Sequence, residues 1–296
     1  MGTSSRALGA LVAAGAGAAA WGLFESQWVE CRALDVEVAA LPAGLDGLTI
    51  LHVSDLHAGT PSLNMRAFRK AVDFGVAARP DLVALTGDIV SHPRATRAVV
   101  AELERLRPPL GISAVLGNHD VGASNDPFSR GVIIEDWGEA PVTLLRGRTQ
   151  AIDRRGVRIE VGGLDADAWL AGRAPPAGEL FSADAGLRLL LAHFPEAAEV
   201  MAPGSADLVL CGHLHGGQIC LPSPWGKLRL AHGVHRYHEG IYREGGTTIV
   251  VTRGLGTTLV PFRLAARPEV SLLRLRPVHR RLPTSYRRHR GWRRRD

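Results

Sequence analysis

Short apolar runs alternate with amphipathic stretches over most of the chain. Runs of four to six residues predict strands, and stretches with apolar residues at every third or fourth position predict helices. Strands that alternate with helices indicate an α/β domain with a largely parallel or mixed sheet. The expected helices are Met65–Ala78 and Ala95–Leu106, and the expected strands are Leu48–Val53, Leu82–Leu85, Ile112–Leu116, Arg158–Gly162, Leu187–Ala192, Asp207–Cys211, Thr247–Thr252 and Val270–Leu275.

The start of the chain has a different pattern. Residues 7–24 are uncharged and mostly Ala and Gly, with Arg6 before them and Glu25 after them. As a helix the run would extend about 27 Å, enough to cross a bilayer core. Because no polar face marks it as a core-facing helix, residues 1–28 are predicted to be a membrane anchor or signal segment. Arg6 then favours a cytoplasmic N-terminus and an extracytoplasmic domain. A signal peptide cleaved near Ala18-Ala19-Ala20 and a soluble Ala-rich helix are the alternatives.

The positive charge is concentrated at the other end of the chain. Residues 280–296 contain eight arginines and one acid, whereas the whole chain has a net charge of +6, so the remainder is close to neutral. Residues 277–296 are therefore expected to form a disordered basic tail, for which anionic lipid is a candidate partner. The sequence argues against nucleic acid as a partner, because no stacking platform or groove-reading motif accompanies the charge. The three cysteines lack CxxC spacing, which argues against cysteine chemistry.

Polar clusters follow five of the expected strands. They are Asp55-Leu56-His57, Gly87-Asp88, Gly117-Asn118-His119-Asp120, His193 and Gly212-His213-Leu214-His215. Loops at the carboxyl ends of strands gather functional groups at one edge of an open α/β sheet, so these clusters are expected to meet. Their carboxylate, amide and imidazole groups suit two metal ions that share a carboxylate. Each cluster alone could be a turn, a helix cap or a core histidine, but all five in these places favour a metal centre.

The order of the clusters resembles that of the calcineurin-like metallophosphoesterase superfamily: D-x-H, G-D, G-N-H-[DE], a lone H and G-H-x-H. The resemblance covers about residues 46–276, and residues 29–45 would connect the N-terminal segment to this domain. Gly212–Ile219, Arg253–Thr257 and Arg267–Val270 look like a bacterial branch of membrane-anchored or exported phosphodiesterases. The fold that the resemblance implies is a two-sheet β-sandwich flanked by α-helices, with the metal site at the carboxyl ends of the strands.

The resemblance also implies a role for each polar residue. Two divalent or trivalent ions (Mn, Fe or Zn) would hold a bridging hydroxide as the nucleophile. His119 matches a non-ligand histidine that stabilises the transition state and protonates the leaving oxygen. The implied metal ligands are Asp55, His57 and His215 at one ion, Asn118, His193 and His213 at the other, and Asp88 between them.

One motif departs from the protein-phosphatase pattern G-D-x-V-D-R. Ser91 replaces the acid that would orient His119, and His92 replaces the Arg that would grip phosphate. A phosphoprotein phosphatase is therefore a weaker hypothesis, and Asp120 is the nearest alternative partner for His119. Asp165, which follows a Gly-Gly-Leu turn, is either a supporting group near the ligands or a structural turn acid.

Taken together, the motifs predict a dinuclear metallophosphoesterase, in particular a phosphodiesterase acting on a small phosphate ester or a lipid. Two alternatives remain: a membrane-tethered pyrophosphatase or lipid phosphoesterase, and a non-catalytic interaction module. Retention of the ligands distinguishes the module from the enzyme, because degenerate members of the superfamily usually lack several of them. All seven are present in this chain.

Overall fold

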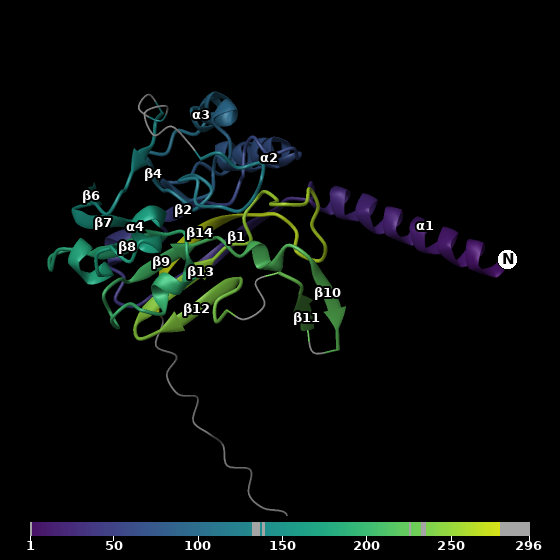
Figure 1. Ribbon diagram of the computed structural model, residues 1–296. Coiled ribbons are helices and arrows are strands. Elements are labelled where there is room, and N and C mark those ends of the chain that lie inside the picture. Colours follow the sequence, from purple (N-terminus) through teal and green to yellow (C-terminus); the bar gives the residue numbers. More distant parts are fainter. Residues whose placement is uncertain (1, 132–136, 138–139, 225, 232–234, 279–296) are drawn as a thin grey trace, which may run out of the picture.

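Two six-stranded β-sheets form the body of the protein in the computed structural model (Figure 1). The structure describes residues 2–278, except 132–136, 138–139, 225 and 232–234. The helices are α1 (Gly2–Glu25), α2 (Asn64–Ala78), α3 (Thr96–Leu103) and α4 (Ala166–Leu170). The strands are β1 (Glu30–Val38), β2 (Thr49–Val53), β3 (Leu82–Thr86), β4 (Ile112–Val115), β5 (Thr143–Leu144), β6 (Thr149–Arg154), β7 (Val157–Leu164), β8 (Leu187–Ala192), β9 (Leu208–Cys211), β10 (Cys220–Ser223), β11 (Gly226–Arg229), β12 (Gly240–Glu244), β13 (Thr247–Val251) and β14 (Glu269–Pro277).

Both sheets are mixed, with a parallel centre. The first has the strand order β1-β14-β2-β3-β4-β5, and the second has the order β12-β13-β9-β8-β7-β6. Strands β2, β3 and β4 run parallel to one another, as do β7, β8, β9 and β13. Antiparallel pairs occur at β14–β2, β6–β7 and β12–β13. The predicted α/β domain with a mixed sheet is confirmed, and the parallel centres place several strand ends at the same edge.

The core lies between the sheets and on both outer faces. Successive strand residues point to opposite faces, so Ile50 of β2 packs between the sheets while Leu51 packs against α2 and α3. In the second sheet, Leu189 of β8 faces the inner core while Leu190 faces the outer layer. Strands covered on both sides need apolar residues on both faces, which is why they appear in the sequence as continuous apolar runs. The predicted two-sheet sandwich flanked by helices is therefore confirmed.

Helix α1 projects from the domain as a long rod (Figure 1). Its segment Leu8–Glu25 has a mean hydropathy of 1.4 and is 11% buried, and by length and composition it could cross a membrane. Only its end contacts the domain. Gly22 O accepts a hydrogen bond from Arg263 N at 3.1 Å, and the Glu25 carboxylate accepts one from Ala266 N at 2.9 Å.

Residues 29–45, expected to be a connector, contain a strand of the first sheet. β1 pairs in parallel with β14 over nine residues, from Glu30↔Glu269 to Val38↔Pro277. It is an edge strand in which only Val36 and Val38 are buried, so it shows no apolar run in the sequence. The polar strands β10, β11 and β12 were missed for the same reason. The basic tail lies outside the described residues from residue 279 onward.

Candidate metal centre

The polar clusters meet at one edge of the sandwich. Asp55 and Asp88 follow β2 and β3 by two residues, and Asn118 follows β4 by three. From the second sheet, His193 comes directly after β8, and His213 follows β9 by two residues. Because these strands are parallel within each sheet, their carboxyl ends open on the same side. The structure brings together all seven predicted ligands and His119.

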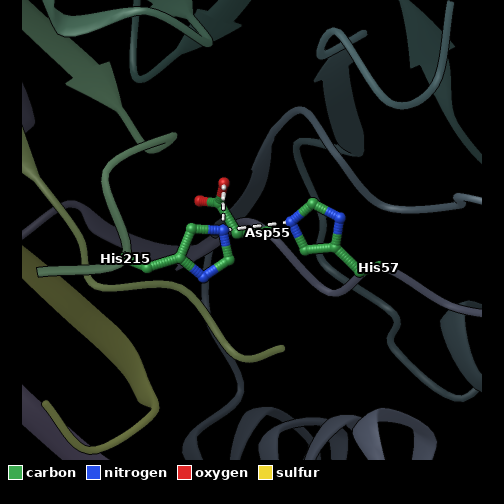
Figure 2. Close-up of side chains that lie close together, drawn as sticks. All are labelled: Asp55, His57 and His215. Atoms are coloured by element: carbon green, nitrogen blue, oxygen red, sulfur yellow. Dashed lines mark hydrogen bonds and ion pairs between the residues drawn. The ribbon is translucent and has the colours of Figure 1, made fainter. Parts of the chain in front are cut away.

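Asp55, His57 and His215 form the first group of candidate ligands (Figure 2). The Nε2 atoms of the two histidines lie 3.1 Å apart, and His215 Nε2 lies 3.6 Å from Asp55 Oδ1. All three side chains are buried. Figure 2 shows both rings presenting a nitrogen toward the same point as the carboxylate. Buried imidazoles this close, beside a carboxylate, leave their lone pairs in place for a shared cation.

A second group lies beside the first and contains Asp88, His193 and His213. His193 Nε2 lies 3.1 Å from Asn118 Oδ1 and 3.1 Å from His213 Nδ1. The Asn118 amide oxygen therefore completes a mixed oxygen and nitrogen donor set. This composition suits a borderline divalent ion such as Zn or Mn, as well as Fe.

Asp88 lies between the two groups. Its Oδ2 is 3.6 Å from His57 Nε2 and 3.2 Å from His193 Nε2. Its other oxygen, Oδ1, accepts a hydrogen bond from the backbone N–H of His119 at 2.8 Å. That bond fixes the orientation of the carboxylate and aims Oδ2 at both groups. One carboxylate oxygen shared by two imidazole clusters is the arrangement expected of a bridging ligand.

The far ring nitrogens of the histidines have partners of their own. His193 Nδ1 lies 2.9 Å from the Thr86 carbonyl, to which it donates, and this leaves Nε2 with a lone pair for a metal. His57 Nδ1 lies 3.1 Å from Ser91 Oγ. Ser91 therefore contacts a candidate ligand and not His119, the residue that the usual acid at its position would orient. These contacts hold the imidazoles in orientations that fit metal binding.

The backbone at the candidate ligands adopts an unusual conformation. Asp55, His57, Asp88, His213 and His215 all have positive φ, from 50° to 75°. A left-handed conformation costs an L-residue roughly 1–2 kcal/mol, and such strain concentrates at functional sites. Glycines beside the candidate ligands leave space for the ligand side chains. A Cβ atom on Gly87 would lie 2.6 Å from His193 Nδ1, and one on Gly117 would collide with the Asp88 carboxylate.

Burial and the charges of neighbouring groups shift the pKa values of the cluster in different directions. Burial raises the pKa of Asp55 to about 6. Burial also holds the pKa of His57 well below its usual range. For His193, burial is outweighed by the adjacent Asp88 carboxylate, which raises the pKa to about 9. The surrounding histidines hold the pKa of Asp88 well below its usual range despite its burial. The site is thus a negative centre surrounded by imidazoles, and cations can replace the proton on His193.

His119 lies at the rim of the cluster and lines a cleft of about 170 Å³ with Asn118, His213 and Leu259. One of its ring nitrogens lies within 4.8 Å of the ligand atoms of His57 and Asp88. Nε2 lies 3.0 Å from Ser124 Oγ, and Nδ1 is buried without a hydrogen-bond partner in the described part of the chain. A buried unpartnered ring nitrogen beside the cluster fits a group that meets substrate or metal there.

The chain is similar to known proteins over the region that contains this site. The family model for calcineurin-like phosphoesterases matches residues 48–217, which include every candidate ligand. The chain belongs to this family. YkuE, an uncharacterised metallophosphoesterase of Bacillus subtilis, is 32% identical over 267 residues, which cover 86% of this chain and 88% of YkuE. Phosphodiesterase YaeI of Escherichia coli is 33% identical over 237 residues, covering 76% of this chain and 81% of YaeI.

A third relative, a Danio rerio transmembrane protein with a metallophosphoesterase domain, is 27% identical over 266 residues. The alignment covers 81% of this chain and 56% of that protein. The family match and the phosphodiesterase relative identify this metallophosphoesterase as a hydrolase of phosphoric esters that uses metal ions.

Asp120, considered above as a partner of His119, and Asp165, considered as a supporting group or a turn acid, have other partners in this metallophosphoesterase. Asp120 is buried, and its carboxylate accepts hydrogen bonds from Gly117 N at 2.8 Å and Val90 N at 2.8 Å. It therefore ties the loop after β3 to the loop after β4. Asp165 lines a separate cavity and forms an ion pair with Arg146 at 2.5 Å. The interpretation of Asp165 as a structural turn acid fits its position better than a place beside the ligands.

Arg263 is a supporting residue that the sequence analysis missed. Its guanidinium is fully buried and donates hydrogen bonds to several backbone carbonyls, including Gly256 O at 2.8 Å and Ala266 O at 3.0 Å. One of its nitrogens also lies 3.1 Å from His215 Nδ1. Burial lowers its pKa to about 9. In the sequence it stands in a loop of apolar residues after Pro261, with no pattern to set it apart from a surface arginine.

Proposed function

We propose that the protein is a dinuclear phosphodiesterase whose two ions are held by the groups on either side of Asp88. The observation that carries the proposal is the position of Asp88 Oδ2, within 3.6 Å of His57 Nε2 and 3.2 Å of His193 Nε2. A single ion would not require ligand clusters on both sides of one carboxylate. The donor set fits Mn, Fe or Zn, with Asp55, His57 and His215 on one side and Asn118, His193 and His213 on the other.

Separate residues of the chain would bind the metal ions and donate a proton to the leaving group. When bound, the metal ions would supply an activated water and neutralise charge on the phosphoryl oxygens. His119 lines the cleft beside the cluster and is the candidate donor of a proton to the leaving oxygen. Ser124, at 3.0 Å from His119 Nε2, holds the ring in place.

The lining of the cleft favours a diester over a monoester. Among the described residues, those that line the cleft include no Lys or Arg. A monoester dianion carries one more negative charge than a diester at neutral pH, and enzymes that bind such dianions commonly use Arg or Lys to pair with it. The metal ions alone are better matched to the single charge of a diester. YaeI, a relative with 33% identity, is named as a phosphodiesterase.

We further propose that α1 anchors the enzyme in a membrane with the catalytic domain outside the cytoplasm. Support comes from the apolar segment Leu8–Glu25, most of which the domain does not cover, and from the relative named as a transmembrane protein. Arg6 on the amino side of the segment favours a cytoplasmic N-terminus. Protease treatment of intact spheroplasts tests the topology, because only an extracytoplasmic domain is digested. Protection of the domain until the cells are lysed would contradict it.

Metal analysis combined with a substrate panel tests the catalytic proposal. The purified full chain, in neutral detergent, is expected to hold two ions per chain and to hydrolyse bis(4-nitrophenyl) phosphate faster than 4-nitrophenyl phosphate. A pyrophosphate diester in the same panel tests the alternative of a pyrophosphatase. Asn118→Ala is expected to lower metal content and turnover, whereas Asp165→Asn, an acid outside the cleft, leaves the metal content intact. One ion per chain at saturation, with full turnover, would contradict the dinuclear assignment.

A further inference from the structure

A groove of about 440 Å³ lies where the end of α1 meets the start of α2. Its walls are mainly apolar, and two cationic side chains stand on the α2 side. None of its lining residues also lines the metal cleft. The groove is therefore separate from the catalytic site. The residues that matter for its chemistry are Leu23, Phe24, Trp28, Leu63, Arg66 and Lys70.

The apolar walls of the groove are exposed to solvent to an unusual degree. Phe24 is 57% exposed, Leu63 51%, Trp28 42% and Leu23 41%. The Phe24 and Trp28 rings pack edge to face at 5.6 Å, and the Arg267 guanidinium covers the Trp28 ring at 3.5 Å. Single exposed apolar residues are normal, but a contiguous group around a hollow marks a binding surface. Aromatic residues at the end of an apolar helix are typical of the membrane interface.

The two cations of the groove stand one helical turn apart on α2. Among the described residues, neither Arg66 nor Lys70 forms an ion pair, and Lys70 Nζ donates only to the Gln27 carbonyl, at 2.6 Å. Arg69 on the same helix contrasts with them, because it pairs with Glu102 at 3.0 Å. The groove thus combines two unneutralised positive charges with an apolar wall. An anionic group attached to an acyl chain complements both features.

The position of the groove indicates which molecule with an anionic group and an acyl chain could reach it. The apolar segment of α1 ends at Glu25, and the groove begins at Leu23. In a bilayer crossed by α1, the groove would lie at the depth of the lipid headgroups, where phosphates are about level with the end of the hydrocarbon core. Residues from the β10–β11 hairpin line another hollow on α1, with Trp21 and Glu25. The end of α1 is thus flanked by the domain on two sides.

We infer that this groove binds one anionic phospholipid from the bilayer that α1 crosses. The phosphate would lie against Arg66 and Lys70, and an acyl chain would lie along Leu63, Phe24 and Trp28. Such a lipid would hold the catalytic domain at a defined angle to the membrane. The inference rests on the proposed membrane anchoring and does not depend on the proposed hydrolytic reaction.

Lipid retention by the full chain tests the inference. The protein is purified in a neutral detergent, mixed with equal amounts of phosphatidylglycerol and phosphatidylcholine, and its bound lipids are counted by native mass spectrometry. Wild type is expected to retain one phosphatidylglycerol in preference to phosphatidylcholine. Arg66→Gln with Lys70→Gln should weaken phosphatidylglycerol binding roughly 30-fold, since each cation near a phosphate contributes about a factor of five. Arg69→Gln with Arg97→Gln removes the same charge from exposed positions on α2 and α3 and should have little effect.

Two further comparisons separate a lipid site from a simple anion site. Leu63→Ser should weaken phosphatidylglycerol binding, whereas Leu170→Ser, at a leucine that is 53% exposed on α4, should not. Glycerol 1-phosphate, which has no acyl chain, should fail to compete at equal concentration. The inference is overturned if wild type shows no preference for the anionic lipid, if the Arg66 and Lys70 variants retain it, or if glycerol 1-phosphate displaces it.

Lipid binding at the groove can be measured separately from hydrolysis at the metal cleft. The Arg66→Gln, Lys70→Gln double variant should keep wild-type turnover of a soluble diester, because neither residue lines the metal cleft. Loss of lipid preference with full turnover would show a site separate from catalysis. Recovery of the wild-type chain in the soluble fraction without detergent would contradict the anchoring on which the inference rests.

Discussion

Ser124 Oγ lies 3.0 Å from Nε2 of His119, whereas the carboxylate of Asp120, the alternative partner that the sequence offers, accepts hydrogen bonds from the backbone of Val90 and Gly117. The same hydroxyl accepts a hydrogen bond from Asp126 N at 3.1 Å, so the loop after β4 holds the serine in place. The hydroxyl therefore fixes the orientation of the His119 ring.

Removal of this hydroxyl should slow the reaction without releasing metal. Ser124→Ala is expected to lower kcat about fivefold to thirtyfold, because the imidazole loses one hydrogen bond of about 1–2 kcal/mol. Ser124→Thr keeps the hydroxyl and should restore most of the rate. Steady-state kinetics and metal analysis of the two variants check this. Equal losses in both variants would show that the loop, and not the hydroxyl, is responsible.

The role of His119 itself can be separated from metal binding by the choice of leaving group. An alkoxide needs a proton from an acid, whereas a nitrophenolate leaves without one. His119→Ala should therefore reduce turnover of an alkyl diester about 10²–10⁴-fold and that of a nitrophenyl diester clearly less. Both ions should remain bound. Loss of a metal ion would instead make His119 a ligand, a role that its position near His57 and Asp88 also permits.

Asp88, the proposed bridging carboxylate, should be the most sensitive ligand. Asp88→Asn keeps the shape of the side chain but removes the charge that offsets two cations. Metal occupancy and hydrolysis are both expected to collapse, with turnover falling below about one part in 10³ of wild type. Elemental analysis and kinetics measure the two effects. Two retained ions with near-native turnover would refute the assignment of Asp88 as the bridge.

The buried guanidinium of Arg263 should contribute to stability as well as to the site. Arg263→Met leaves the carbonyls of Gly256, Ala266 and their neighbours without donors in the core. Each unsatisfied buried group costs about 1–3 kcal/mol, so the free energy of unfolding should fall by about 3 kcal/mol or more. Urea denaturation measures the loss. Arg263→Lys, which keeps the charge and an N–H donor group, should be less harmful than Met. Equal stability of all three proteins would contradict this role.

Metal binding should release a proton whose source is His193. With the pKa of His193 at about 9, this residue is protonated at pH 7 in the metal-free protein, whereas His57 is already neutral. A metal must displace that proton, so apparent affinity should rise about tenfold per pH unit from pH 7 until the pH reaches about 9. Calorimetry in buffers with different ionisation enthalpies counts the protons. No proton release at pH 7 would contradict the assignment.

Much of the fold and the candidate site followed from the sequence alone. A strand buried on both faces requires a continuous apolar run, so β2, β3, β8 and β9 could be recognised without tertiary information. Parallel neighbours open at one edge, which brought Asp55, Asp88 and His193 together as predicted. Edge strands with a polar face, such as β1, leave no such run, and their pairing depends on a partner far along the chain.

The tertiary structure alone decided the contacts that tune the site. Ser91 contacts His57 across 34 positions of sequence, and Arg263 contacts His215 across 48. Both contacts involve histidines in loops with positive φ. In such loops the side chains do not follow the period of a strand or a helix. The groove at α1 likewise exists only because the end of one helix packs beside the start of another. The local sequence pattern determines which residues lie at the end of a strand, whereas long-range packing determines which groups each of them contacts.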